Sequence, residues 1–458
     1  MNVDQLRSRI AGRVIEPGDP EYGDARKLFY GGMDRKPAHI VRVAGPADVA
    51  HTIEFARDSG LELAVRSGGH SVAGHSVNDG GVVIDLHDMR GLAIDATART
   101  AWAETGLTAL DYTAASHEHG LATGFGDSGS VGIGGLTLGG GVGYLSRKQG
   151  LTIDNLIAAD VVTADGELVH ADAESHSDLF WAIRGGGGNF GVATRFQYRL
   201  HEVGTVYGGM LILPATADAI ASFIAAAEAA PDELSAIASV MPAPPMPFLS
   251  PDQVGKRVIL AMIVCTGPLD AAARAVAPFR SLAEPIADML RPMPYPEIYP
   301  PEAPNYHPIA SSRTMLVDTV DPNVVMEHLD ASKAKFQVAQ IRVLGGAIAR
   351  VPVNATAYAH RARRIMVNVA CLYEQPEEAA IHDVWADRFW RALQNGEPGA
   401  YVNFLGIDGP SRLREAYPGD TWDRLCAVKS RYDPANVFRL NQNVPPARGG
   451  AVVRKLET

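Results

Sequence analysis

The stretch Val65-Arg66-Ser67-Gly68-Gly69-His70-Ser71 is the most informative part of this chain. It follows an apolar run with strand-like alternation (Leu61, Leu63, Val65), and it sets two adjacent glycines directly before a histidine. Paired glycines permit backbone conformations that other residues avoid, and they let amide groups approach an anion closely. The stretch therefore predicts a phosphate-holding loop after a strand, with a histidine that such a loop does not itself need.

Length and charge limit the classes of protein that the chain can belong to. With 458 residues it is long for a single core, so two domains are expected. Its 41 basic and 52 acidic residues give a net charge of −11, which argues against a partner that is a nucleic acid or an anionic membrane. No run of about 18 apolar residues occurs, so no membrane span is expected. Oligomeric state stays open.

The cysteines and the first residues bear on redox environment and location. Cys265, Cys371 and Cys426 are far apart and form no CxxC pair, so neither a disulfide framework nor a metal site is expected. The first seven residues include an acid and begin no apolar segment, so we expect no signal peptide. These features favour a cytoplasmic protein.

Residues 1–204 combine features of helices and strands. Short β-branched runs such as Val82–Ile84 and Leu156–Val162 alternate with helix-like pieces such as Pro46–Ile53, which has a proline at its start and an acid in its first turn. This mixture predicts an α+β domain over residues 1–204.

The remaining chain changes character. Residues 205–400 contain an alanine-rich helix at Ala217–Ala230 and a proline-rich loop at Pro292–Pro304. Gln340–Leu344 alternates partly like a strand, and the two glycines after it suggest a bulge or a close backbone approach. A last block follows at residues 401–458.

Three further glycine clusters lie in the first domain, at residues 124–129, 132–143 and 185–191. The cluster at residues 132–143 can be aligned only loosely with the GxGxxG motif. No clear strand–helix–strand unit surrounds it, so a Rossmann site for a nicotinamide cofactor is disfavoured. The glycines could simply make turns. Because glycine inside an element costs roughly 1 kcal/mol relative to alanine, so many glycines favour loops that converge on a long ligand containing a diphosphate.

The motifs resemble those of a known flavoprotein family. The stretch 66–71, the segment Val131–Gly143 and the pair Asp154-Asn155 are similar to the FAD domain of the vanillyl-alcohol-oxidase superfamily (PCMH-type). The segments 401–404 and 428–443 resemble the C-terminal part of berberine-bridge-enzyme-like oxidases. The resemblance implies a two-domain α+β fold. Residues 1–204 would bind FAD, residues 205–400 would form a substrate domain with an antiparallel sheet covered by helices, and residues 401–458 would return to the FAD domain.

The resemblance also implies how the FAD is held. It assigns to His70 a covalent bond to the 8α-methyl group of the flavin, with His75 as a rival in principle. Many relatives carry a second link from a cysteine where this chain has Ser128, and because a hydroxyl is a far weaker nucleophile than a thiolate, a single link is expected. The other residues implied to contact FAD are Arg66, Ser67, Gly68, Gly69, Ser71, Ser128, Val131, Gly132, Gly134, Gly135, Gly139, Gly143, Val192, Asn403, Asn441 and Asn443.

The family chemistry needs a base and an electron acceptor. Tyr401 in the Tyr-x-Asn motif is the candidate catalytic residue, and the alternative is a tyrosine packed at the domain junction. Val131 stands where valine in plant relatives permits access of O2 and leucine restricts it. These residues favour an oxidase that takes a hydride from an alcohol, a sugar-type compound or an amine and forms H2O2. A dehydrogenase with another acceptor, or a non-catalytic FAD-binding redox protein, remains an alternative.

Overall fold

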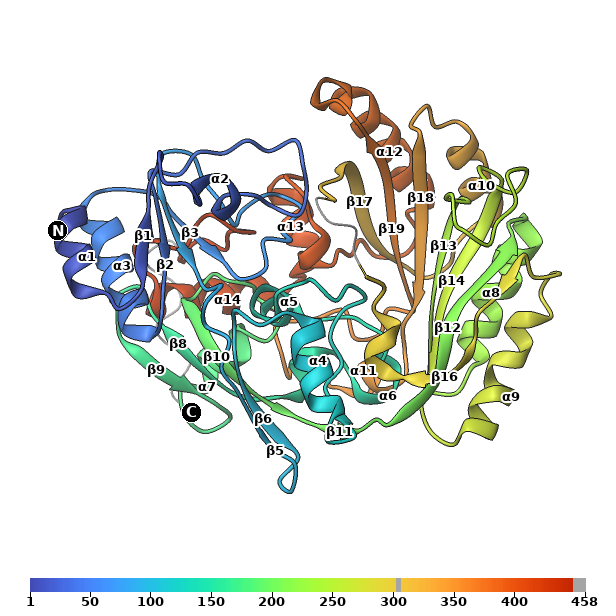
Figure 1. The fold of residues 1–458 in the computed structure, drawn as a ribbon, viewed down its shortest axis with the longest axis horizontal. Helices are drawn as coiled ribbons and strands as arrows, with labels where there is room; N and C mark the ends of the chain where they lie inside the picture. The colour runs from blue at the N-terminus through green and yellow to red at the C-terminus, as the bar shows by residue number, and fades with distance from the viewer. Residues whose placement is uncertain (302–305, 448–458) are drawn as a thin grey trace.

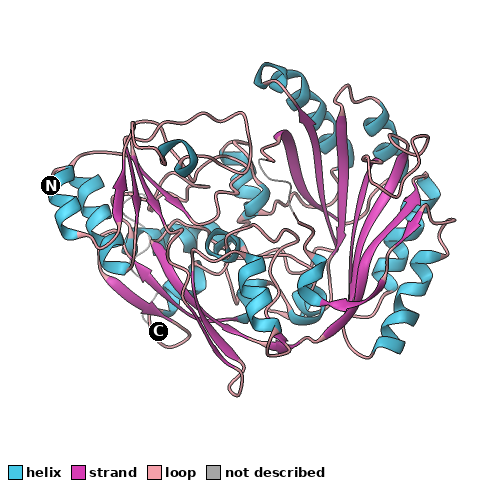
Figure 2. Cartoon of the chain, in the orientation of Figure 1, coloured by secondary structure: helices cyan, strands magenta, loops and turns pink. Residues whose placement is uncertain are grey.

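The computed structural model describes residues 1–301 and 306–447, which form two lobes lying side by side (Figure 1). Both lobes mix helices and strands (Figure 2), so the predicted α+β class is confirmed. The first lobe has two sheets of four and five strands and a two-stranded pair, and the second lobe has one large sheet. The last residues of the expected block 401–458, and residues 302–304 of the proline-rich loop, fall outside the described residues.

A small sheet at the N-terminus leads into the glycine–histidine loop. Its strand order is β1 (Arg13–Ile15), β2 (His39–Arg42), β4 (Val82–Asp85) and β3 (Leu63–Arg66). Strand β4 runs parallel to both β2 and β3, and helix α3 (Pro46–Asp58) forms the crossover from β2 to β3 on either side of β4. Helix α3 starts at Pro46, as predicted, and packs with α1 (Val3–Arg9). The short helix α2 (Tyr22–Ala25) lies between β1 and β2 in the sequence.

The second sheet of the first lobe is antiparallel and carries the other glycine loops. Its order is β5 (Leu92–Asp95), β6 (Thr100–Glu104), β10 (Val192–Arg199), β8 (Leu156–Val162) and β9 (Leu168–Ala171). A short pair joins β7 (Leu121–Ala122) to β11 (His201–Glu202). The helices between these strands are α4 (Ala109–His117), α5 (Ile133–Gly139), α6 (Ser146–Gln149), the 3-10 turn η1 (Thr152–Asn155) and α7 (Ser177–Ala182).

The second lobe is one antiparallel sheet with helices on one face. The order is β15 (Ala287–Asp288), β12 (Thr205–Pro214), β14 (Arg257–Cys265), β13 (Leu234–Pro242), β18 (Phe336–Val343), β19 (Ile365–Tyr373) and β17 (Ile309–Val317), with β16 (Arg291–Pro294) also pairing with β12. One face buries alternate strand residues against α8 (Ala217–Ala229), α9 (Leu269–Arg280), α10 (Pro322–Asp330) and α12 (Ala379–Leu393). We call this the helix face and the opposite one the inner face.

Local chemistry explains several boundaries in this lobe. Helix α8 covers the predicted alanine-rich segment and starts where the Thr216 hydroxyl accepts a hydrogen bond from the Ala219 amide. After β18, Gly346 has φ +54°, and a Cβ there would lie 2.2 Å from the Arg147 carbonyl oxygen. The close backbone approach expected from the glycine pair is therefore confirmed. Short elements η2 (Tyr295–Ile298), α11 (Ala347–Arg350) and η3 (Pro376–Glu378) complete the lobe.

The C-terminal segment contains η4 (Val402–Phe404), α13 (Pro410–Ala416) and α14 (Asp420–Tyr432). Its apolar residues Leu413, Leu425 and Val444 belong to the same buried cluster as Phe125 and Phe196 of the first lobe. The segment is thus built into the core that supports the glycine loops.

In the described residues, no helix has the length and apolar character needed to cross a bilayer. The same residues hold no group of three or more histidine, cysteine or acidic side chains arranged for a metal ion.

Candidate active site

A cavity of about 360 Å³ lies where the glycine loops meet the C-terminal segment. Most of the residues predicted to bind cofactor line it, together with the predicted catalytic tyrosine. They are Ser67, Gly68, Gly69, His70, Ser71, Ser128, Val131, Gly132, Gly134, Gly135, Val192, Tyr401, Asn403 and Asn441. Residues from five separate stretches of the sequence therefore converge on one space.

Two of the glycine loops touch backbone to backbone at this wall. A Cβ on Gly68 would lie 2.2 Å from the Gly132 nitrogen, and one on Gly132 would lie 2.3 Å from the Gly68 nitrogen. Ser67 joins the same contact, since its hydroxyl donates to the Thr105 carbonyl (2.6 Å). By contrast, a Cβ on Gly135 or Gly188 would meet no atom within 4 Å. Glycine thus brings the loops together and leaves parts of the backbone open at the cavity.

Four predicted contact residues do not line the cavity. The Arg66 guanidinium donates to the Ala25 carbonyl instead. A Cβ on Gly139 would lie 2.0 Å from the Asn403 Oδ1 atom, and one on Gly143 would lie 1.7 Å from the Phe125 carbonyl oxygen, so these glycines permit close packing. The Oδ1 atom of Asn443 is buried without a hydrogen-bond partner among the described residues.

His70 is held in place from two sides. Its Nε2 atom lies 2.9 Å from the Ser130 hydroxyl, and its ring stacks on Phe29 with the centroids 4.2 Å apart. The Ser128 Oγ atom lies 3.3 Å from the Ser130 Oγ atom. His75 also lines the cavity, and burial lowers its pKa to about 4, so its imidazole is neutral at pH 7. Both histidines named from the sequence therefore reach the same wall.

The hydroxyl oxygen of Tyr401 accepts hydrogen bonds from two donors. It accepts hydrogen bonds from the Gly141 backbone amide (2.8 Å) and the Asn403 Nδ2 atom (2.9 Å). Burial raises the pKa of Tyr401 to about 12, while the two hydrogen bonds and the charge of Arg342 act in the opposite direction. Because both donors point at the oxygen, this site is built to stabilise negative charge there. Tyr358 packs edge-on against the Tyr401 ring, with centroids 6.2 Å apart.

Sequence reasoning missed an ion pair beside this tyrosine. Arg342, on β18, pairs with Asp127 of the first-lobe glycine loop, and its guanidinium lies 5.0 Å from the centroid of the Phe404 ring. Asp127 and Phe404 both line the cavity. The sequence places Arg342 only within a strand-like run, because nothing in its sequence neighbourhood shows which loop the strand meets.

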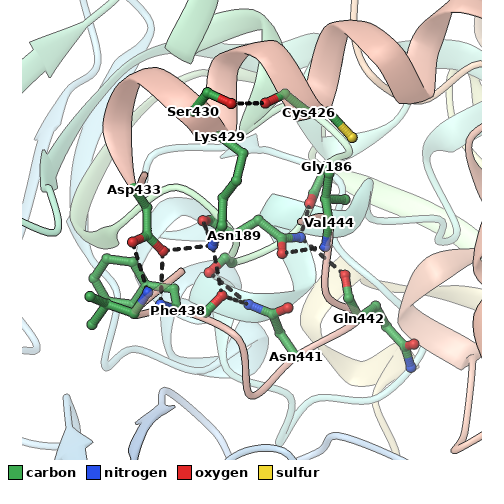
Figure 3. A network of polar contacts seen from close by, with 12 residues as sticks. Gly186, Asn189, Cys426, Lys429, Ser430, Asp433, Phe438, Asn441, Gln442 and Val444 are labelled. Atoms are coloured by element: carbon green, nitrogen blue, oxygen red, sulfur yellow. Dashed lines mark hydrogen bonds and ion pairs between the residues drawn. The ribbon is translucent and has the colours of Figure 1, made fainter. Parts of the chain in front are cut away.

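A second missed feature is a buried network that fastens the C-terminal segment to the loop at residues 185–191 (Figure 3). The Lys429 ammonium donates to the Asp433 carboxylate (2.6 Å), the Asn189 carbonyl (2.7 Å) and the Phe438 carbonyl (2.9 Å). The Asn189 side chain accepts from the Val444 amide (2.9 Å) and donates to the Gly186 carbonyl (2.8 Å). Asn189 lines the cavity, so this network shapes its far end.

Comparisons with known proteins agree with this arrangement. The family described as FAD binding domain matches residues 37–172, and the one described as berberine and berberine like matches residues 400–445. YvdP of Bacillus subtilis, named as an uncharacterized FAD-linked oxidoreductase, is 30% identical over 456 residues, which cover 96% of this chain and 99% of the relative. The chain belongs to the berberine-bridge-enzyme-like FAD-linked oxidoreductases.

Two other proteins match along almost the whole chain. (R)-6-hydroxynicotine oxidase of Paenarthrobacter nicotinovorans is 28% identical over 452 residues, covering 95% of this chain and 97% of the relative. The xylooligosaccharide oxidase of Myceliophthora thermophila C1 matches with a TM-score of 0.85 and 24% identity, covering 98% of this chain and 100% of that chain. The predicted two-domain fold of the vanillyl-alcohol-oxidase type is therefore confirmed, and the protein is an enzyme.

The cavity fits the FAD of the berberine-bridge-like family. Open backbone at Gly135 and Gly188 offers amides to a diphosphate, and His70 lines the same cavity. The buried Oδ1 atom of Asn441 has no hydrogen-bond partner among the described residues, although the residue lines the cavity. Such an atom is expected to receive a hydrogen bond from a bound group.

Proposed function

We propose that this enzyme is an oxidase that holds FAD through a single covalent bond to His70. It would oxidise a small alcohol, sugar-type or amine substrate and pass the electrons to O2. The observation that carries the proposal is the pair of hydrogen bonds that Gly141 and Asn403 donate to the Tyr401 hydroxyl. Tyr401 and His70 line the same cavity. We also propose a cytoplasmic location, for which the three free and buried cysteines are the supporting observation.

The residues divide the chemistry between them. Bound FAD supplies an acceptor for the hydride that leaves the substrate carbon. Tyr401 receives the proton of the substrate O–H or N–H group, and the donors Gly141 and Asn403 stabilise its oxygen whenever it is deprotonated. The substrate thus loses two electrons and two protons and gains a C=O or C=N double bond. O2 takes up the same electrons and protons and leaves as H2O2.

The covalent link rests on the setting of His70. A neutral imidazole is nucleophilic through one ring nitrogen while the other is engaged, and the Ser130 hydroxyl contacts Nε2. Stacking on Phe29 fixes the plane of the ring. Ser128 supports a single link, because a hydroxyl at that position lacks the nucleophilicity of a thiolate.

The first prediction concerns this link. Acid-denatured wild-type protein should carry the mass of one flavin, and His70→Ala should lose it, because no thiolate stands at the second attachment position. Ser128→Ala is the matched control at the cavity wall and should keep the full flavin mass. His75→Ala should keep it as well. Flavin retained by His70→Ala but lost by His75→Ala would contradict the assignment.

The second prediction concerns the electron acceptor. Val131 lines the cavity and is half-buried, so a larger side chain there would take up part of the cavity. Val131→Leu should slow reoxidation of the reduced enzyme by O2 roughly tenfold, the scale of one added methylene group in a pocket. Stopped-flow mixing with oxygenated buffer measures this rate. The rate at which the substrate reduces the flavin should change little. If Val131→Leu slows flavin reduction and reoxidation by O2 equally, Val131 does not control the access of O2.

The alternatives give different outcomes. A dehydrogenase would be reduced by substrate and reoxidised by an artificial quinone but hardly by O2 in the wild type. A non-catalytic flavoprotein would be reduced by dithionite and by no alcohol, sugar or amine under anaerobic conditions.

A further inference from the structure

A second, smaller cavity of about 20 Å³ lies where the two lobes meet. At this junction, helix α6 of the first lobe lies against β13 and α11 of the second (Figure 1). The residues that line the cavity come from both lobes, among them Ser146 and Arg147 of α6 and Ser235, Ile237 and Arg342 of the large sheet. We call this space the junction cavity.

Sheet register brings Arg342 to the junction cavity. Arg342 on β18 is directly opposite Ile237 on β13. Its neighbours Ile341 and Val343 are buried in the cluster of the helix face, so strand alternation sets Arg342 on the inner face. Its guanidinium is therefore turned away from the core of its own lobe and toward the first lobe.

Both arginines of the junction cavity are buried with donors left over. Arg342 is 3% exposed and pairs with Asp127 through Nη2, and Arg147 is 7% exposed. The Arg147 guanidinium donates to the Leu344 carbonyl (2.6 Å) and the Ala230 carbonyl (2.9 Å) of the second lobe. The Arg147 Nε atom and the Arg342 Nε and Nη1 atoms are buried with no hydrogen-bond partner among the described residues. Because buried donors normally have partners, three such atoms on two arginines of one cavity indicate a bound acceptor.

The charge around the junction cavity favours an anion over water as that acceptor. Asp127 neutralises Arg342, but Arg147 forms no ion pair within the part of the chain that the structure describes. The carboxylates that act on Arg147 through their charge, Asp232 and Glu228, each pair with an exposed arginine instead. Burial lowers the pKa of the Arg147 guanidinium, as expected for a cation without its own counter-ion. Since buried charges are usually paired, one positive charge at this cavity calls for an anion.

The size and the lining of the junction cavity limit which anion fits. About 20 Å³ holds one particle of the size of a water molecule or slightly larger. A single halide ion suits this space, whereas an organic acid such as gluconate is too large. The Ser146 hydroxyl accepts a hydrogen bond from the Gly143 amide (2.8 Å), so its own proton is left to donate. All the lining residues are described, and none of them carries a carboxylate that would repel an anion.

We propose that the junction cavity binds one chloride ion between Arg147 and Arg342. The ion supplies the counter-charge that Arg147 lacks and accepts hydrogen bonds from the guanidinium nitrogens. Because the two arginines belong to different lobes, the ion stabilises the contact between the lobes. Val142 lines both this cavity and the flavin cavity, so the anion lies behind the flavin site and not within it. The proposal does not depend on the proposed oxidase function.

Bromide serves as the probe in crystals, because it resembles chloride in size and charge and scatters X-rays anomalously. Crystals of the FAD-loaded full chain, grown without halide, are soaked in sodium bromide. We expect an anomalous difference peak between the guanidinium groups of Arg147 and Arg342. A junction cavity that contains only water, or nothing, after the soak would overturn the proposal.

Thermal unfolding tests the site in solution. At constant ionic strength, replacing sodium gluconate with sodium chloride at ten times its dissociation constant should raise the unfolding midpoint of the wild type by about 2 °C, because the ion binds only the folded chain. Arg147→Met should lose this rise. Arg184→Met is the matched control, since Arg184 also donates to a backbone carbonyl of the other lobe, that of Ala355, but does not line the junction cavity.

The control variant should keep the full rise with chloride. Equal rises in the wild type and in Arg147→Met would overturn the proposal, and so would loss of the rise in both variants. If Arg147→Met does not fold, the bromide peak in the wild type decides.

Discussion

Phenylalanine in place of Tyr401 should lower the rate of flavin reduction by substrate about 10²–10⁴-fold, the usual contribution of a positioned acid or base. The substitution removes the one oxygen at which the Gly141 and Asn403 donors point, while the ring keeps its packing against Phe404. Rapid mixing of enzyme and substrate without oxygen isolates this step from reoxidation.

The pH dependence gives the same experiment a second readout. Tyr401 accepts a proton only when it is deprotonated, and burial raises its pKa to about 12, so the reactive fraction grows as pH rises. The rate of reduction in the wild type should therefore increase with pH across the neutral and mildly alkaline range. Tyr401→Phe should lose this rise. Tyr358→Phe is the control. The Tyr358 ring contacts Tyr401, but the Tyr358 hydroxyl has no hydrogen-bond partner among the described residues.

If the wild-type rate of flavin reduction is independent of pH and Tyr401→Phe has only a small effect, Tyr401 is not the catalytic base. Asn403→Asp separates positioning from general disturbance, since a carboxylate cannot donate the hydrogen bond that Asn403 Nδ2 gives to the phenol oxygen. This variant should slow reduction at neutral pH and keep the covalent flavin.

Methionine in place of Lys429 should lower the free energy of unfolding by about 3–5 kcal/mol, the cost of removing one partner from a buried ion pair. The ammonium is fully buried and donates to one carboxylate and two carbonyl oxygens, all of which would lose a partner. Urea denaturation followed by fluorescence measures the loss. Because one of these partners, Asn189, belongs to the loop at residues 185–191 that lines the cavity (Figure 3), the variant should also bind flavin poorly.

The exposed pair between Arg431 and Asp178 provides the control for this substitution. Arg431→Met removes a cation from the same helix, two residues away, but its side chain is 62% exposed, so its effect should stay within about 1 kcal/mol. If both variants unfold at the same denaturant concentration, the buried network does not hold the C-terminal segment as described.

The Lys429 network also has a pH signature with a definite sign. Burial lowers the pKa of Lys429 below its value in the unfolded chain, although Asp433 opposes the shift. In the window between the two pKa values the unfolded chain binds more protons, so this group contributes a stability that increases as pH rises through that window. Lys429→Met should remove that contribution.

Much of the active site could be predicted from the sequence because its parts are local motifs. The loop after β3 needs glycine at position 68, because a Cβ there would collide with the Gly132 nitrogen. This requirement is visible in the sequence as a glycine motif. The alanine-rich helix and the proline at the start of α3 are likewise local signals. Arg66, Gly139, Gly143 and Asn443 show the limit, since a motif names its members without saying which of them reach the ligand.

The sequence by itself determined the family, the α+β class and the loops that meet at the flavin site, because close backbone contact restricts the residue type at each glycine. Only the tertiary structure decided which side chains from distant strands stand beside those loops. Arg342 meets Asp127 across 215 residues, and it aligns with Ile237 through sheet register. Strand pairing and lobe packing set such contacts, and either residue type alone is compatible with many other neighbours.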